Sequence, residues 1–274
     1  MTDGARPVPE MGSGDFEVRD NGTIQTVTDL TVHSLPIDVT ILFQFSASGP
    51  QFVRVRTALG RAIASLRPVD QYRLLTADMS SVHGSGWASG PASGLPVKTF
   101  DAPSWSTRPL NNGMLYEGLA LALATRSGLD RRHLGLLITD PVEDGLSFVD
   151  VRALTDAARY TDLVLSVVLT EDPGLEAVKR PEERQSSVPE AVRTLAELTG
   201  GQFLVRKNVG DDLGQAAVDA LETFKSSYVL AFTPSDRSHP GWHDLNVKVV
   251  KPGAAHFTVI ARRGYMEPGV ARDR

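Results

Sequence analysis

The sequence predicts an α/β fold, with a doubly wound, mostly parallel, Rossmann-like sheet flanked by helices and a small antiparallel β unit formed by the N- and C-terminal strands. Between residues 36 and 226, short apolar runs typical of buried strands alternate with segments whose apolar residues recur at helical spacing. Outside this region strand patterns separated by turn residues replace the helical spacing. Repeated strand-then-helix alternation implies right-handed crossovers between parallel strands.

The first ordered element is predicted to be a β-hairpin. Residues 16–20 form its first strand, and residues 24–32 alternate in polarity as its second strand. Between them, Asn21-Gly22 supplies the two residues that readily adopt the positive φ of a tight hairpin turn.

The central region divides into five strands and five helices. Pro68 stops the first helix, and Gly200-Gly201 ends the fourth in the manner of a left-handed C-cap. Residues 84–94 are rich in Gly, Ser and Pro and match no phosphate-binding motif, so we expect a flexible surface loop there. The predicted strands are 37–45, 72–76, 134–139, 163–169 and 202–205, and the predicted helices are 52–66, 114–125, 148–158, 188–198 and 213–224.

Beyond residue 225 three further strands are predicted, at residues 228–233, 244–250 and 256–261, separated by Pro and Gly turns. These strands must pack against another element of the chain, and we expect that element to be the N-terminal hairpin. The predicted organisation is therefore a flexible N-terminus (1–14), the hairpin (15–35), the α/β domain (36–226), the C-terminal strands (227–265) and a flexible tail (266–274).

Composition narrows the classes of function. The 274 residues carry a net charge of −5, so there is no Lys and Arg excess with which to neutralise nucleic-acid phosphates. Cysteine is absent, which excludes disulfides and thiolate chemistry. No apolar run is long enough to suggest a membrane span, and residues 1–14 lack the apolar core of a signal peptide.

Three blocks of sequence resemble one family. They are Asp15-Phe-Glu-Val-Arg-Asp-Asn-Gly, the strand end Gln44-Phe-Ser-Ala-Ser, and a tail running from Ser227-Tyr-Val-Leu-Ala-Phe-Thr-Pro to Ala261-Arg-Arg-Gly-Tyr. In this order the blocks resemble the VWFA-related domain abundant in Acidobacteria, a von Willebrand factor type A-like fold with added terminal strands. The resemblance implies a metal-ion-dependent adhesion site (MIDAS) at the carboxyl ends of the parallel strands, built from Asp-x-Ser-x-Ser, a Thr and a further Asp.

This chain departs from that ligand set at two positions. Ser46 and Ser48 match the hydroxyl ligands, and Asp140 matches the carboxylate of the third loop. Gln44 stands where the first Asp is expected, and Gly113, after Asn111-Asn112, stands where the Thr is expected. Because a dication bound by one carboxylate instead of two loses a large Coulomb term, we expect a degenerate site. No cofactor is expected beyond weakly bound Mg²⁺ or Mn²⁺.

Several of these residues have simpler explanations. In the simpler interpretation, Asp140 caps the turn that follows a buried strand. Trp87 and Trp105 fall in the irregular stretch near the predicted site face, where they either anchor a protein contact or fold back over the sheet edge. His239 and His243 flank a Pro-Gly turn, which explains them better than a metal pair does. No nucleophile-and-base motif is present.

The predicted function is a non-enzymatic protein-interaction or adhesion module with a degenerate MIDAS. Its partner-binding residues are predicted to be Gln44, Ser46, Ser48, Asn112, Gly113, Asp140, Trp87 and Trp105, and the partner is an unidentified protein. One alternative is a working Mg²⁺ or Mn²⁺ adhesion site with Gln44 as a ligand, and another is an unrecognised hydrolase on the same face. The family resemblance implies an exported protein, periplasmic or extracellular.

Overall fold

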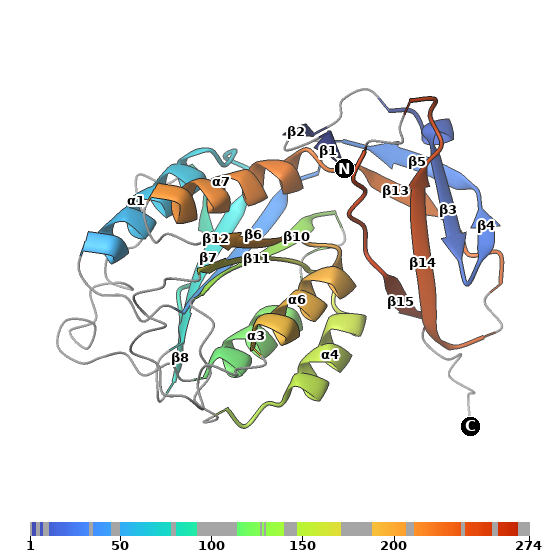
Figure 1. Ribbon diagram of the computed structural model, residues 1–274. Coiled ribbons are helices and arrows are strands. Elements are labelled where there is room, and N and C mark those ends of the chain that lie inside the picture. Colours follow the sequence, from blue (N-terminus) through green and yellow to red (C-terminus); the bar gives the residue numbers. More distant parts are fainter. Residues whose placement is uncertain are drawn as a thin grey trace.

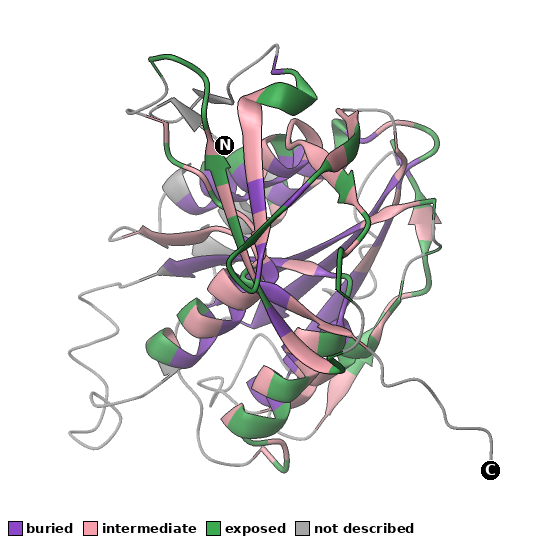
Figure 2. Cartoon of the chain, turned by 90° about the vertical axis from the view of Figure 1, so that its right-hand side faces the viewer, coloured by how far each residue is buried: buried purple, intermediate pink, exposed green. Residues whose placement is uncertain are grey.

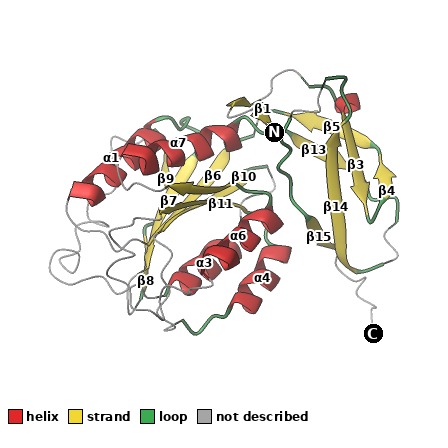
Figure 3. Cartoon of the chain, in the orientation of Figure 1, coloured by secondary structure: helices red, strands yellow, loops and turns green. Residues whose placement is uncertain are grey.

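The structure is a computed structural model that describes residues 2–3, 6–7, 11–32, 35–44, 50–77, 81–91, 114–126, 128, 130–139, 147–170, 188–206, 211–236, 239–253 and 257–267. A central sheet with helices on both faces lies beside a smaller unit of antiparallel strands (Figures 1 and 3). The predicted fold class is therefore confirmed.

The central sheet has the order β12-β11-β10-β6-β7-β8, with β9 also paired to β7. Strands β6, β7, β10, β11 and β12 are parallel, whereas β8 and β9 run antiparallel to β7. Chain order reverses between β6 and β10, as it does in doubly wound sheets. The bounds are β6 (Ile37–Gln44), β7 (Gln71–Ala77), β8 (Val82–Gly84), β9 (Ala88–Ser89), β10 (Arg132–Thr139), β11 (Val164–Thr170) and β12 (Phe203–Arg206).

Of the helices in the described ranges, two cover one face of this sheet and three cover the other (Figure 1). Helices α1 (Pro50–Ala64) and α7 (Asp211–Lys225) pack on the first face, and α3 (Leu115–Ala124), α4 (Val151–Tyr160) and α6 (Val188–Thr199) on the second. All eight residues of β6 are buried, and buried residues fill the middle of the sheet in Figure 2. Burial on both faces explains why the central strands read as continuous apolar runs.

The segment predicted to be a flexible loop at residues 84–94 is partly ordered against the sheet. Its described part contains the last residue of β8 and all of β9, and Ser85 extends the pairing, because its N–H donates to the Leu74 carbonyl (2.9 Å) and its Oγ accepts from the Leu74 N–H (2.9 Å). The expectation was wrong here because the edge of β7 offers unpaired backbone groups that a polar, Gly-rich segment can still satisfy. Residues 92–94 lie outside the described part.

The β unit joins both ends of the chain, as predicted. Strand β14 lies between β3 and β15, β4 extends this sheet beside β3, and β5 pairs with β13. Asn21 and Gly22 have φ values of 46° and 82°, which confirms the predicted hairpin turn. The bounds are β3 (Phe16–Asp20), β4 (Thr23–Gln25), β5 (Val27–Thr31), β13 (Val229–Phe232), β14 (Gly241–Val249) and β15 (Gly264–Glu267).

The last strand was predicted too early. Instead of residues 256–261, the ladder to β14 is formed by β15. The described residues before β15 are extended but bind the α/β domain: the Arg263 N–H donates to the Leu198 carbonyl, and Arg262 donates to the carbonyls of Ala158 and Thr161. Ahead of β3, two short strands, β1 (Thr2–Asp3) and β2 (Arg6–Pro7), pair with each other, and a 3₁₀ turn covers Ser13–Asp15.

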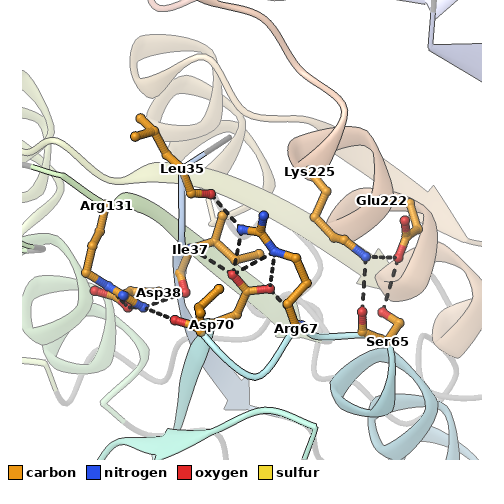
Figure 4. A network of polar contacts seen from close by, with 10 residues as sticks. Leu35, Ile37, Asp38, Ser65, Arg67, Asp70, Arg131, Glu222 and Lys225 are labelled. Carbon is orange, nitrogen blue, oxygen red and sulfur yellow. Dashed lines mark hydrogen bonds and ion pairs between the residues drawn. The ribbon is translucent and has the colours of Figure 1, made fainter. Parts of the chain in front are cut away.

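A polar network fastens the amino-terminal edge of the sheet (Figure 4). The buried Asp70 carboxylate accepts from the Ile37 N–H (3.0 Å) and from both the N–H (2.8 Å) and the guanidinium of Arg67. Beside it, Arg131 forms an ion pair with Asp38 (2.6 Å). Burial by itself would raise the pKa of Asp70, but the hydrogen bonds from Arg67 and Ile37 outweigh it and lower the pKa.

Candidate functional site at the carboxyl edge of the sheet

Gln44 and Thr139 mark the point where the order of the sheet reverses. They are register partners, each the last residue of its strand, on the adjacent strands β6 and β10. In open α/β sheets, ligands bind outside the carboxyl ends of the strands at such a reversal point. The topology therefore directs the search for a functional site to the loops that follow these two residues.

The Gln44 side chain is held inside the protein at this edge. Gln44 is 2% exposed and Thr139 is fully buried, and the Thr139 hydroxyl donates a hydrogen bond to the side-chain oxygen of Gln44. A buried polar side chain needs such a partner, since desolvation without one costs about 1–3 kcal/mol. The oxygen expected to face a metal ion in the family pattern thus binds the neighbouring strand.

Most of the other predicted site residues lie outside the described part of the chain. These are Ser46, Ser48, Trp105, Asn112, Gly113 and Asp140. Their flanking residues are described, and they converge: Gln44 precedes the first loop, Thr139 precedes the third, and Met114 (φ 54°) follows the second at the start of α3. Helix α3 packs closely on β6, because a Cβ at Gly118 would lie 2.9 Å from Leu42 Cδ1. The three predicted loops therefore leave from adjacent elements at one edge.

Of the positions expected to hold a divalent cation, Gln44 is the one that lies in the described part of the chain. Mg²⁺ prefers an octahedral oxygen shell that includes one or two carboxylates. In the described ranges, no group of three or more His, Asp or Glu residues is placed to hold a metal ion. At Gln44 the side chain is neutral, and its oxygen is already engaged with Thr139. Asp140 is the one carboxylate that the family resemblance would still provide.

Phe148 is an exposed aromatic residue on this face that the sequence reading missed. It was assigned to the apolar stripe of a helix, but it precedes α4 and is 92% exposed. Asp150 is the N-cap of α4, with its carboxylate accepting from the Ala153 N–H (2.7 Å). An N-capping Asp two residues after an aromatic was the signal that could have excluded Phe148 from the stripe.

Glu117 holds the backbone at Phe148 in place. This residue lies in the first turn of α3, and one of its carboxylate oxygens accepts from the N–H groups of Phe148 and Val149 (3.1 Å for Val149). Burial opposes ionisation of Glu117, but hydrogen bonds, including those from Val149 and Phe148, outweigh burial and lower its pKa. Phe148 is thus presented to solvent from a fixed backbone.

Trp87 lies at the opposite edge of the sheet. Its ring is 6.1 Å from the ring of His133 near the start of β10, and the Arg73 guanidinium stacks on it at 5.0 Å. His133 is six residues before Thr139, which corresponds to about 20 Å along a strand. The structure therefore places Trp87 away from the predicted site face, as in the reading in which this residue folds back over the sheet.

The two histidines around the Pro240-Gly241 turn belong to the β unit. His243 is buried: its Nδ1 lies 2.8 Å from Asp20 Oδ1, and its Nε2 lies 2.8 Å from the His239 carbonyl oxygen. His239 is exposed and pairs with Asp236 (2.9 Å). Because His243 has a partner at each ring nitrogen, the interpretation of these residues as a structural turn holds.

Comparison with known proteins shows similarity of structure only. No family model and no curated protein matches the chain. Proximal thread matrix protein 1 of the mussel byssus is similar at a TM-score of 0.49 and 9% identity, covering 70% of this chain and 48% of that one. VWA2, an ArnB paralog from Sulfolobus acidocaldarius, has a TM-score of 0.47 at 11% identity, covering 78% and 55%. A von Willebrand factor type A structure from Catenulispora acidiphila has a TM-score of 0.42 at 13% identity, covering 76% and 50%.

The chain thus spans about half the length of each of these three structures. At such identities and TM-scores the likenesses carry no argument about activity. The sheet order and the edge at Gln44 and Thr139 define a doubly wound α/β domain whose binding face would be built by loops. Among the helices that the structure describes, none has the length and apolar character needed to cross a membrane.

Proposed function

We propose that this chain is a non-enzymatic protein-interaction module of the von Willebrand A type, whose binding face needs no tightly held metal ion. The face consists of the loops after Gln44 and Thr139, the loop before Met114, and Phe148. The observation that carries the proposal is the buried hydrogen bond from the Thr139 hydroxyl to the Gln44 side-chain oxygen. This bond joins two adjacent strand ends through uncharged groups, at the position where the family has its metal site.

The hydrogen bond supports an ion-independent face for an electrostatic reason. Two carboxylates at adjacent strand ends would repel each other and would need a cation between them, whereas the Gln44 side chain is neutral and its oxygen accepts from the Thr139 hydroxyl. The edge can then keep its shape without an ion. A partner would be bound by exposed side chains of the loops, and aromatic residues are common anchors of such contacts.

Phe148 is the described residue best placed to be that anchor. It is exposed, its backbone is fixed by Glu117, and it precedes α4 on the side where the chain leaves β10. An anchor that is already positioned loses little entropy on binding. Tyr160 offers a matched control, since it is exposed at the other end of the same helix.

The test is affinity capture from extracts of the source organism with the full chain as bait, in the presence of either Mg²⁺ or EDTA. A specific partner should be retained equally in both conditions, lost with Phe148→Ala or Asp140→Arg, and retained with Tyr160→Ala. Capture that requires Mg²⁺ or Mn²⁺ would instead support the adhesion-site alternative with Gln44 as a ligand. Capture unaffected by every variant on this face would contradict the proposal.

A further inference from the structure

A cavity of about 400 Å³ lies between the α/β domain and the β unit, at the edge of the sheet opposite to the proposed binding face. One wall is the amino-terminal edge of the sheet with the end of α7, and the other is the inner face of the β unit. Its volume is within the range of small-molecule sites, which commonly lie at such junctions.

The β-unit wall is apolar. The side chains of β14 that line the cavity are Leu245 and Val247, which alternate with the exposed Asn246 and Lys248 on the other face of the strand. Val18 on β3 lies opposite Val247 in the ladder and is 2% exposed. Further apolar residues of this wall are Phe16, Val229, Leu230 and Phe232. A cavity wall of this kind favours the hydrocarbon part of a ligand.

The opposite wall contains a cation without a counter-ion. Arg132 donates through one terminal nitrogen to the Phe224 carbonyl (2.8 Å) and to the Ser227 hydroxyl, and its guanidinium stacks on the Phe224 ring at 4.2 Å. Its Nε and second terminal nitrogen have no partner among the described residues, and no described carboxylate is within ion-pair distance. Burial lowers the pKa of Arg132 to about 10, which leaves it charged at neutral pH.

Further polar groups line the same cavity. The side-chain oxygen of Gln202 is buried without a hydrogen-bond partner in the described chain, and the Ser166 hydroxyl accepts from the Gln202 N–H (3.3 Å). A half-turn of the Gln202 amide would present N–H donors instead. Arg262 adds positive charge, although its hydrogen bonds are given to backbone carbonyls. Asp162, the carboxylate in the lining, is exposed.

We propose that this cavity binds a small amphipathic carboxylate, with its head group at Arg132 and its hydrocarbon chain against β14 and β3. A guanidinium binds a carboxylate through charge-assisted hydrogen bonds, and Nε and the second terminal nitrogen of Arg132 each keep a donor that can reach one carboxylate oxygen. A desolvated charge without a partner is costly, so an anion that neutralises it gains more than it would at the surface. This site does not depend on the proposed interaction face.

The first experiment measures binding of decanoate and of decanol, a neutral probe of equal chain length, to the full chain by isothermal titration calorimetry below their aggregation concentrations. We expect decanoate to bind with one-to-one stoichiometry and about tenfold or more tightly than decanol, since hydrogen bonds to charged groups contribute about 1.5–3 kcal/mol. Equal affinity for both compounds, or no binding of decanoate, would overturn the proposal.

Two variants locate the site. Arg132→Met should remove the preference for decanoate over decanol, whereas Arg193→Met, which alters an exposed arginine stacked on Phe203, should leave it intact. Val247→Trp should fill the cavity and abolish binding of both probes, whereas Lys248→Trp places the same side chain on the exposed face of β14. If Arg132→Met does not fold, the tryptophan pair still decides: decanoate binding that survives Val247→Trp would refute the assignment.

Discussion

His243 and Asp20 are 223 residues apart in the sequence and form a buried pair, with Nδ1 of the imidazole 2.8 Å from Oδ1 of the carboxylate. The Tyr265 hydroxyl donates to the other carboxylate oxygen (2.8 Å), so residues of β3, β14 and β15 meet at one point. Since the second ring nitrogen of His243 faces the His239 carbonyl, both nitrogens can donate only when the ring is protonated.

This arrangement predicts a loss of stability at alkaline pH. The His239 carbonyl raises the pKa of His243 above its ordinary value of 6.5, burial opposes the shift, and Asp20 adds to it. Because the folded-state pKa is the higher one, the contribution should be complete below about 6.5 and lost as pH rises through the folded-state pKa. Urea unfolding from pH 5 to 9 would measure this loss. His243→Gln should flatten the curve in that range, and an equally steep curve would contradict the assignment.

Gln44→Asp combined with Gly113→Thr is predicted to make the chain responsive to metal ions. The double variant restores the carboxylate and the hydroxyl of the family's ligand set, and an ion that binds only the folded state raises its stability. Melting temperature in Mg²⁺, in Mn²⁺ and in EDTA would measure the effect, at about 2–4 °C per kcal/mol for a chain of this size.

Gln44→Leu is the control for that prediction. It leaves the Thr139 hydroxyl without its acceptor, so it should cost about 1–3 kcal/mol and remain insensitive to metal. A double variant that is equally insensitive would show that the loops do not converge as the family pattern requires.

Asp70→Ala should destabilise the chain by about 2 kcal/mol, because it removes the acceptor of the Ile37 N–H and the carboxylate that pairs with the Arg67 guanidinium. This loss of stability is smaller than that expected for a fully buried ion pair, because the Arg67 side chain is 39% exposed. The exposed pair of Arg159 and Asp156 supplies the control: Asp156→Ala should change unfolding free energy by less than about 1 kcal/mol. Chemical denaturation of both variants would measure the difference.

The same carboxylate predicts part of the acid sensitivity. The folded-state pKa of Asp70 is below its ordinary value of 3.8, so its contribution is present above that value and lost as pH falls through the folded-state pKa. Asp70→Ala should therefore flatten the acid limb of the stability curve. An unchanged acid limb would mean that other carboxylates dominate it.

Gly201→Ala should cost about 3 kcal/mol or more, since its Cβ would lie 1.8 Å from the Leu165 carbonyl oxygen. Gly60→Ala provides the opposite control: in α1 the added methyl meets no atom within 4 Å, so a gain of about 0.5–1 kcal/mol is expected from helix propensity. Thermal unfolding of the two variants would show whether Gly201→Ala lowers the melting temperature and Gly60→Ala raises it. Tolerance of Gly201→Ala would show that β11 and the end of α6 are less closely packed than described.

The sequence predicted the structure best where the conformational preference of individual residues agrees with the packing of the whole fold. Asn21-Gly22 and Gly200 were read correctly because their positive φ values are a property of the residues themselves. Phe148 and the last strand were misread because spacing alone cannot show which extended or apolar residues bind another element. Trp87 was misplaced because sequence does not tell which edge of a sheet a side loop returns to. Of the predicted site residues, Gln44 and Trp87 are the two with a described environment.

The pairing of β14 with β3 gives the chain an order of assembly. Residues 16–20 pair with β4 on one side and with residues 245–249 on the other, so during synthesis this second edge of β3 stays open until β14 has been made. The α/β domain can condense in that interval, because its strands pair with neighbours that lie closer in sequence. We therefore expect β14 to pair with β3 after the α/β domain has condensed, and a nascent chain halted before β14 would leave one edge of β3 unpaired.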